Sequence, residues 1–135
     1  MELGTGCGLV GLTAAAHGAQ EAVLTDQVLH VATINADANF EGEDRRRIRL
    51  ERLKWGDEEA ATALGPPFDL ILGSDIIYHA QDFDVLAETM ASLAAVGTVA
   101  YLCTPDGSPR PWRPCRATPS PPPSSSLHSP SRWRR

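Results

Sequence analysis

The chain has 135 residues, which is enough for one folded domain and too few for two of ordinary size. It carries 12 basic and 17 acidic residues, and this acidic balance argues against binding to the phosphates of nucleic acid. It has no run of 18 apolar residues that could span a membrane, and its first residues do not resemble a signal peptide. We therefore expect an intracellular monomer, cytoplasmic or nuclear, that binds neither nucleic acid nor membrane.

The composition divides the chain after Thr104. Residues 105–135 contain nine of the 11 prolines, six arginines and a single acidic residue, and they have too few apolar residues to form a core. We therefore expect an ordered, partial domain over residues 1–104 and a disordered Pro/Ser/Arg-rich tail over residues 105–135. The three cysteines, Cys7, Cys103 and Cys115, match the spacing of neither a zinc site nor a disulfide framework, so we expect no bound metal.

Strands and helices alternate along the first 104 residues. After a strand stub at residues 1–3 and a glycine loop, the expected helices cover residues 9–17, 27–39, 57–64 and 81–93. The expected strands cover residues 21–25, 47–53, 68–75 and 98–103. This alternation predicts the α/β fold class, with a parallel, doubly wound sheet. Residues 47–53 alternate polar and apolar side chains, as in an edge strand, whereas the helix at residues 9–17 is apolar nearly all round and should be buried.

The first candidate site is the glycine loop at residues 4–8. In doubly wound sheets the ligand lies beyond the carboxyl ends of the strands, and alternating glycines allow a ligand to approach the backbone amides. The same glycines also fit a dinucleotide fingerprint, Gly6-x-Gly8-x-x-Gly11, although Gly11 falls inside the expected helix, where it can serve packing. An ordinary strand-to-helix turn is a third interpretation.

Two further strand ends carry candidate residues. Asp26 follows the second strand, where a carboxylate can accept hydrogen bonds from the two hydroxyls of a ribose or can cap the next helix. Asp75 and Tyr78 follow the strand at residues 68–75, so both can border one cleft. Together, the loop and Asp26 predict a ligand that contains adenosine.

Four motifs, in this order and spacing, resemble methyltransferase family 16. They are residues 2–11 (ELGTGCGLVG), 24–26 (LTD), 53–56 (LKWG) and 74–78 (SDIIY). Members of this family are seven-β-strand enzymes that use S-adenosyl-L-methionine, and most of them methylate lysine side chains of proteins. The resemblance covers residues 1–102 and implies a Rossmann-like class I methyltransferase fold, incomplete here, that acts on a protein substrate.

The resemblance also implies roles for individual residues. The cofactor-binding residues would be Glu2, Gly4, Thr5, Gly6, Asp26, Trp55 and Gly73. In this set the glycine loop contacts the methionine part of the cofactor and Asp26 holds the ribose. Trp55 flanks the adenine, although a simple core aromatic is an equal interpretation of this residue.

Asp75 and Tyr78 would be the catalytic pair that borders the channel where the amine meets the methyl group. Methyl transfer from an activated sulfonium depends mainly on positioning, so we assign neither residue as an obligatory base. A dry channel beside a positive sulfur favours the neutral form of a lysine amine.

The sequence also departs from the family. Family members have a full first strand before the glycine loop and further strands after the fifth, so we expect a chain truncated at both ends, with low stability and weak or absent catalysis. Two alternatives remain open at this point. One is a non-catalytic remnant or binding module of the same fold, and the other is a fragment of an NAD-dependent oxidoreductase.

Overall fold

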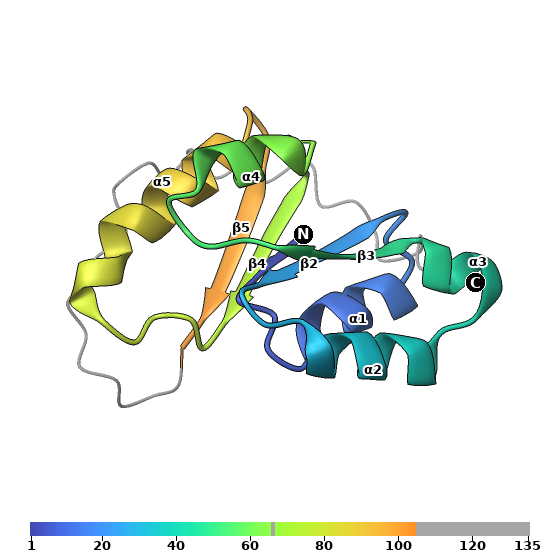
Figure 1. Cartoon of the computed structure of the whole chain (residues 1–135). Coiled ribbons are helices and arrows are strands. Elements are labelled where there is room, and N and C mark those ends of the chain that lie inside the picture. Colours follow the sequence, from blue (N-terminus) through green and yellow to red (C-terminus); the bar gives the residue numbers. More distant parts are fainter. Residues whose placement is uncertain (66, 105–135) are drawn as a thin grey trace, which may run out of the picture.

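The computed structural model describes residues 1–65 and 67–104 (Figure 1). Its strands are β1 (Glu2–Leu3), β2 (Ala22–Asp26), β3 (Ile48–Arg52), β4 (Leu70–Ser74) and β5 (Val99–Cys103). Its helices are α1 (Leu9–Ala16), α2 (His30–Asn39), α3 (Gly42–Arg46), α4 (Glu58–Ala63), the 3-10 turn η1 (Ala80–Asp82) and α5 (Phe83–Leu93). The predicted disorder of residues 105–135 lies outside the described residues.

The five strands form one parallel sheet in the order β3-β2-β1-β4-β5. Strand β1 lies at the centre, where Glu2 is opposite both Leu24 of β2 and Leu72 of β4. Strand β3 lies at one edge, as its alternating side chains predict. The sheet confirms the α/β fold class and the parallel pairing expected from the sequence.

Helices cover both faces of the sheet, and each face has its own core (Figure 1). Helices α1 and α2 pack on one face, around the buried residues Leu12, Ala15, Ala22, Leu24, Ala36 and Ile48. Helices α4 and α5 pack on the other face, around Leu3, Val23, Leu53, Ala61, Leu64, Ile71, Ile76, Leu86 and Leu93. Val23 and Leu24 enter opposite cores because successive side chains of a strand point to opposite faces.

The structure corrects two expectations about the helices. The predicted burial of the first helix is wrong, because Leu9 is 69% exposed and the buried residues of α1 lie on one face. Helix α2 begins at His30 rather than near residue 27, and only Ala32 and Ala36 are buried along it. Apolar residues of this segment such as Val31, which is 51% exposed, face outward.

The short helix α3 was not expected from the sequence. Its residues carry mixed charges and none of them is buried, so hydrophobic periodicity gives no signal for it. In the part of the chain that the structure describes, no helix is long and apolar enough to cross a membrane.

Candidate functional site

A cleft of about 590 Å³ lies at the carboxyl ends of β1 and β2. The strand order reverses at β1, since β2 lies on one side of it and β4 on the other. In open parallel sheets, ligands bind at such a reversal, where the loops after neighbouring strands separate. The cleft is lined by Gly4, Gly6, Asp26, Gln27, Leu53, Lys54, Trp55, Ile76, Tyr78, Asp82 and Val85.

The glycine loop leads from β1 into α1 and forms the floor of the cleft. Gly4 has a φ of +61°, and a Cβ added to it would lie 2.6 Å from Cγ2 of Ile76 and 3.6 Å from Cζ2 of Trp55. A side chain at this position would meet both a strained backbone and a filled space. The loop is held from the other side by Asn35 of α2, whose Nδ2 donates to the Cys7 carbonyl at 2.7 Å.

Glu2 supports the loop from beneath, away from the residues that line the cleft. Its buried carboxylate accepts hydrogen bonds from the hydroxyl of Thr5 and, at 2.9 Å, from the backbone N–H of Gly11. Burial raises the pKa of the Glu2 carboxyl from its usual 4.5, and the two hydrogen bonds oppose that shift. Gly11 lies in α1 against the sheet, because a Cβ there would be 2.6 Å from Leu24 Cγ.

Asp26 connects the end of β2 to the glycine loop. Its Oδ2 accepts from the Gly6 N–H at 2.9 Å, and its Oδ1 accepts from the N–H groups of Gln27 at 2.7 Å and Val28 at 3.3 Å. A carboxylate has about four lone-pair sites, so the side chain keeps capacity for a further donor. The side chain makes no cap on α2, whose N-cap residue is Leu29 and has no side-chain hydrogen bond.

Trp55 lies in the turn that joins β3 to α4. The turn is closed by a hydrogen bond from the Asp57 N–H to the Lys54 carbonyl at 3.0 Å, and Gly56 has a φ of +85°. Asp57 then caps α4, because its Oδ1 accepts from the Ala60 N–H at 2.9 Å. Trp55 is partly buried against the core and also lines the cleft, so its packing role is shown, whereas its contact with an adenine remains a prediction.

The remaining predicted site residues, Gly73, Asp75 and Tyr78, lie at or after the end of β4 and differ in burial. Asp75 is exposed and has a φ of +55°, and its N–H donates to the Cys103 carbonyl of β5 at 2.8 Å. Tyr78 is 67% exposed and lines the cleft. Gly73 lies beneath Ile76, because a Cβ added to Gly73 would be 2.5 Å from Cδ1 of Ile76.

The structure brings together five of the nine predicted site residues around the cleft, namely Gly4, Gly6, Asp26, Trp55 and Tyr78. Glu2, Thr5 and Gly73 lie beneath the lining residues, and Asp75 lies on the exposed exit of β4. Sequence reasoning missed several lining residues, among them Ile76, Asp82 and Val85. Ile76 lies inside the motif at residues 74–78, although it was assigned no role there, whereas nothing in the local pattern distinguishes Asp82 and Val85 from other residues near the start of a helix.

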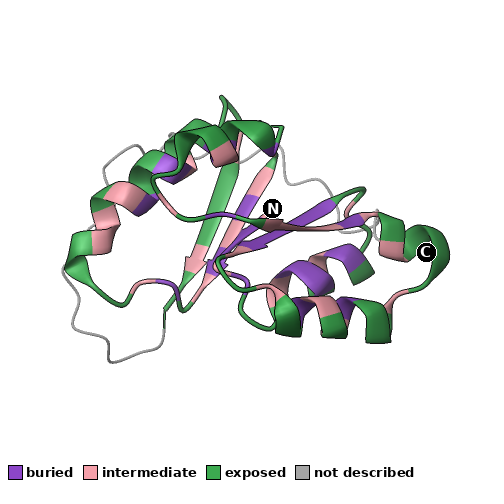
Figure 2. Ribbon diagram, viewed as in Figure 1, coloured by how far each residue is buried: buried purple, intermediate pink, exposed green. Residues whose placement is uncertain are grey.

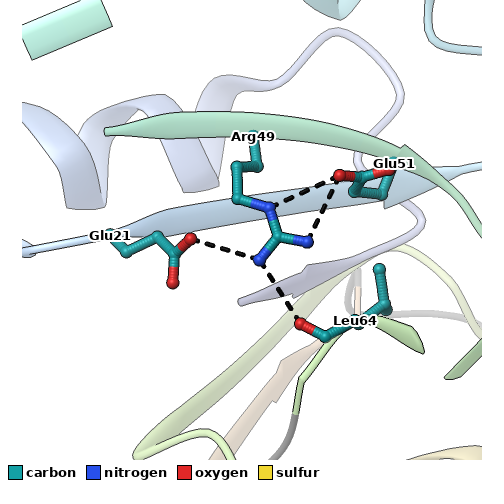
Figure 3. Close-up of polar contacts among 4 residues, drawn as sticks. All are labelled: Glu21, Arg49, Glu51 and Leu64. Carbon is teal, nitrogen blue, oxygen red and sulfur yellow. Dashed lines mark hydrogen bonds and ion pairs between the residues drawn. The ribbon is translucent and has the colours of Figure 1, made fainter. Parts of the chain in front are cut away.

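The arginines between residues 45 and 49 form ion pairs beside the edge strand β3. Arg45, Arg46 and Arg47 pair with Asp37, Glu43 and Asp44, and all three ion pairs include largely exposed carboxylates. Figure 3 shows Arg49 of β3 donating to Glu21 at 3.2 Å, to Glu51 and to the carbonyl of Leu64. Hydrogen bonding to Glu21 raises the pKa of Arg49, so this residue remains a fixed cation that joins the edge strand to its neighbours.

The described residues contain no candidate metal centre. Across residues 1–65 and 67–104, no three His, Cys, Asp or Glu side chains lie where they could hold a metal ion. Cys7 and Cys103 are both exposed free thiols.

Comparison with known proteins identifies the class and then the family. The parallel sheet with β1 at its centre, the glycine loop and the cleft define a Rossmann-like methyltransferase fold. Residues 1–107 match the family described as lysine methyltransferase, and the chain belongs to this family. The family resemblance found in the sequence is therefore confirmed.

Individual relatives are similar over the same part of the chain. The chain is 36% identical over 104 residues to the protein N-lysine methyltransferase METTL21A of Danio rerio, and 36% identical over 103 residues to that of Mus musculus. Each match covers 76% of this chain and 47% of the relative. The protein N-terminal and lysine N-methyltransferase EFM7 of Cryptococcus neoformans is 29% identical over 110 residues, which are 75% of this chain and 37% of that protein. The chain thus spans about half the length, or less, of these curated relatives.

Proposed function

We propose that the cleft binds S-adenosyl-L-methionine and that the protein transfers its methyl group to a lysine side chain of a protein substrate. The observation that carries this proposal is the joint geometry of the glycine loop and Asp26. The loop excludes side chains at Gly4, and Asp26 fixes the loop through Gly6 while keeping a lone-pair site for a further donor. Membership of the lysine methyltransferase family supports the same reaction.

The residues around the cleft fit the parts of this cofactor. The glycine loop, Gly4 to Gly6, would contact the methionine part, and Glu2 would support the loop through Thr5. Asp26 would accept a hydrogen bond from a ribose hydroxyl at its remaining lone-pair site, which suits a carboxylate at the end of the second strand. The indole of Trp55 would flank the adenine. Gly73 lies beneath Ile76, so it would affect the adenosine only by setting the position of the Ile76 side chain.

The cofactor supplies, when bound, a methyl group on a positively charged sulfur that is already activated for transfer. The chain's own contribution is to bring the lysine amine into line with that methyl group. Tyr78, at the exposed rim of the cleft, would shape the entrance, and the Asp75 carboxylate on the β4 exit would orient the incoming amine. The apolar wall formed by Ile76 and Val85 would limit access of water and so favour a neutral amine.

Binding can be tested by titration calorimetry with S-adenosylhomocysteine and, separately, with NAD. We expect the former to bind and the substitution Asp26→Ala to weaken binding by tenfold or more, because it removes both the ribose acceptor and the bond to Gly6. Asp37→Ala is the matched control, since this exposed carboxylate pairs with Arg45 outside the cleft. Binding of NAD without binding of S-adenosylhomocysteine would overturn the proposal.

Transfer can be tested separately with cofactor that carries a labelled methyl group and a lysate as the source of protein substrates. We expect label on lysine side chains, and less of it with Asp26→Ala. Binding of S-adenosylhomocysteine without any transfer to protein would favour the alternative of a non-catalytic module.

A further inference from the structure

We propose that Thr89 of α5 is a positioning residue that holds Trp55 in place against the cleft. Thr89 touches neither the cleft nor its proposed ligand, and it acts through the backbone of Gly56. The consequence for ligand affinity rests on the proposed function, whereas the consequence for the position of Trp55 does not.

The turn that carries Trp55 depends on the orientation of one peptide group. Trp55 and Gly56 are the two central residues of a turn closed by the hydrogen bond from Asp57 to Lys54. The φ of +85° at Gly56 is the value that the third residue of a type II turn requires. A type II turn differs from a type I turn mainly by a flip of the central peptide group, which here links Trp55 to Gly56. Flipping this peptide group would turn the Gly56 N–H away from α5 and release from that helix the turn that carries Trp55.

Thr89 fixes that peptide group with one hydroxyl. Its Oγ1 accepts a hydrogen bond from the Gly56 N–H at 2.9 Å and donates to the Val85 carbonyl at 2.8 Å. Thr89 is only 4% exposed, so solvent cannot readily replace the acceptor. Because the hydroxyl proton is used on Val85, the lone pairs remain directed to the turn.

The turn and α5 also meet without space between them. A Cβ added to Gly56 would lie 2.8 Å from Cγ1 of Val85, so the glycine backbone packs directly on the helix. Val85 and Trp55 both line the cleft, and Trp55 Cζ2 lies close to Gly4 of the loop. Thr89, one helical turn after Val85, therefore sets how the β3–α4 turn and the first turn of α5 together form one wall of the cleft.

The experiment compares three substitutions in the full chain, with Trp112 and Trp133 replaced by phenylalanine so that Trp55 is the only tryptophan. Thr89→Val removes the acceptor and keeps the shape, whereas Thr89→Ser keeps the hydroxyl. Thr62→Val is the matched control, because Thr62 makes the same type of bond to a helix carbonyl, that of Glu58 at 2.7 Å, on the exposed side of α4. The measurements are acrylamide quenching of Trp55 without ligand, affinity for S-adenosylhomocysteine by calorimetry, and thermal melting.

We expect Thr89→Val to make Trp55 more accessible to acrylamide and to weaken S-adenosylhomocysteine binding about tenfold, the effect of one lost buried hydrogen bond. Thr89→Ser should stay within about twofold of the parent in both measurements, and so should Thr62→Val. If Thr89→Val does not fold, Thr89→Ala replaces it in the comparison with Thr89→Ser.

Unchanged quenching in Thr89→Val, or equal losses in Thr89→Val and Thr89→Ser, would overturn the inference. If the parent chain binds no S-adenosylhomocysteine, the proposed function fails, and the quenching measurement still decides whether Thr89 positions Trp55.

Discussion

Strands β2 and β5 have the same length and similarly apolar sequences, AVLTD and VAYLC, yet their surroundings are opposite. The first four residues of β2 are buried, and the strand pairs with β1 on one side and β3 on the other. Among the described residues, strand β5 pairs only with β4, and four of its five residues are exposed. Figure 2 shows this strand mostly in the colour of exposed residues. The composition of a strand therefore does not determine its place in the sheet.

The candidate site is built next to the buried strand. Asp26 ends β2, and Thr25 ties β2 to β1 because its hydroxyl donates to the Glu2 carbonyl at 2.8 Å. On the β4 side, the exit loop carries the exposed residues Asp75 and Tyr78, with the buried Ile76 between them. The site therefore combines a buried strand beside the glycine loop with an exposed loop at the cleft entrance.

The largest expected effect tests that contrast directly. Leu24→Ala should lower the free energy of unfolding by about 3 kcal/mol, because Leu24 is completely buried and its removal leaves a cavity between α1 and the sheet. Tyr101→Ala in β5 should cost less than about 1 kcal/mol, since that side chain is 66% exposed. Urea unfolding of both variants measures the two values. Equal losses would mean that β5 is covered in solution.

The second prediction separates backbone strain from crowding in the glycine loop. Gly4→Ala should lower the free energy of unfolding by about 3 kcal/mol, because it combines a positive φ with displacement of the buried Ile76. Gly6→Ala should cost only about 1 kcal/mol, since its φ is also positive, at +54°, but no atom lies within 4 Å of the added Cβ. Thermal melting of the two variants makes the comparison. A cost for Gly6→Ala as large as that for Gly4→Ala would contradict the close packing of Ile76.

A smaller effect concerns the turn after β3. Asp57→Ala should lower the free energy of unfolding by about 1 kcal/mol, because it removes the side-chain acceptor for the Ala60 N–H at the start of α4. Asp57→Asn should restore most of this loss, because asparagine is an equally good capping residue. Chemical denaturation of the pair gives the answer, and failure of asparagine to restore stability would show that charge rather than capping matters here.

The smallest expected effect is a pH dependence that arises from Glu2. Because burial raises the pKa of this carboxyl above 4.5, the folded chain keeps a proton that the unfolded chain releases, and stability falls as pH rises from about 4.5 through the folded pKa. Glu2→Gln lacks this titration. Its stability relative to the parent should therefore increase with pH across that window and stay level on either side of it. Urea unfolding over a pH series measures the difference, and a constant or decreasing difference would show that the carboxyl is not destabilised by burial.

Local patterns in the sequence were sufficient for most of the fold. The alternation of helices and strands and the edge position of residues 47–53 each depend on near neighbours in the chain. The same holds for the predicted strand-end residues Asp26 and Tyr78, which line the cleft because parallel strands end at one edge of a sheet. The functional roles assigned to the nine site residues remain predictions.

Only the tertiary structure decided which residues meet across the molecule. Val85 and Thr89 meet the turn at Trp55 from a helix more than 25 residues further along the chain, and no local period encodes that contact. The outward position of Leu9 in α1 and the exposure of β5 are likewise settled by what packs nearby and not by hydrophobicity. The sequence by itself determined the strands, the longer helices, their order and the family, because these follow from short-range propensities and motifs. The depth of each side chain and the wall of the cleft required the fold, because burial depends on contacts between distant segments.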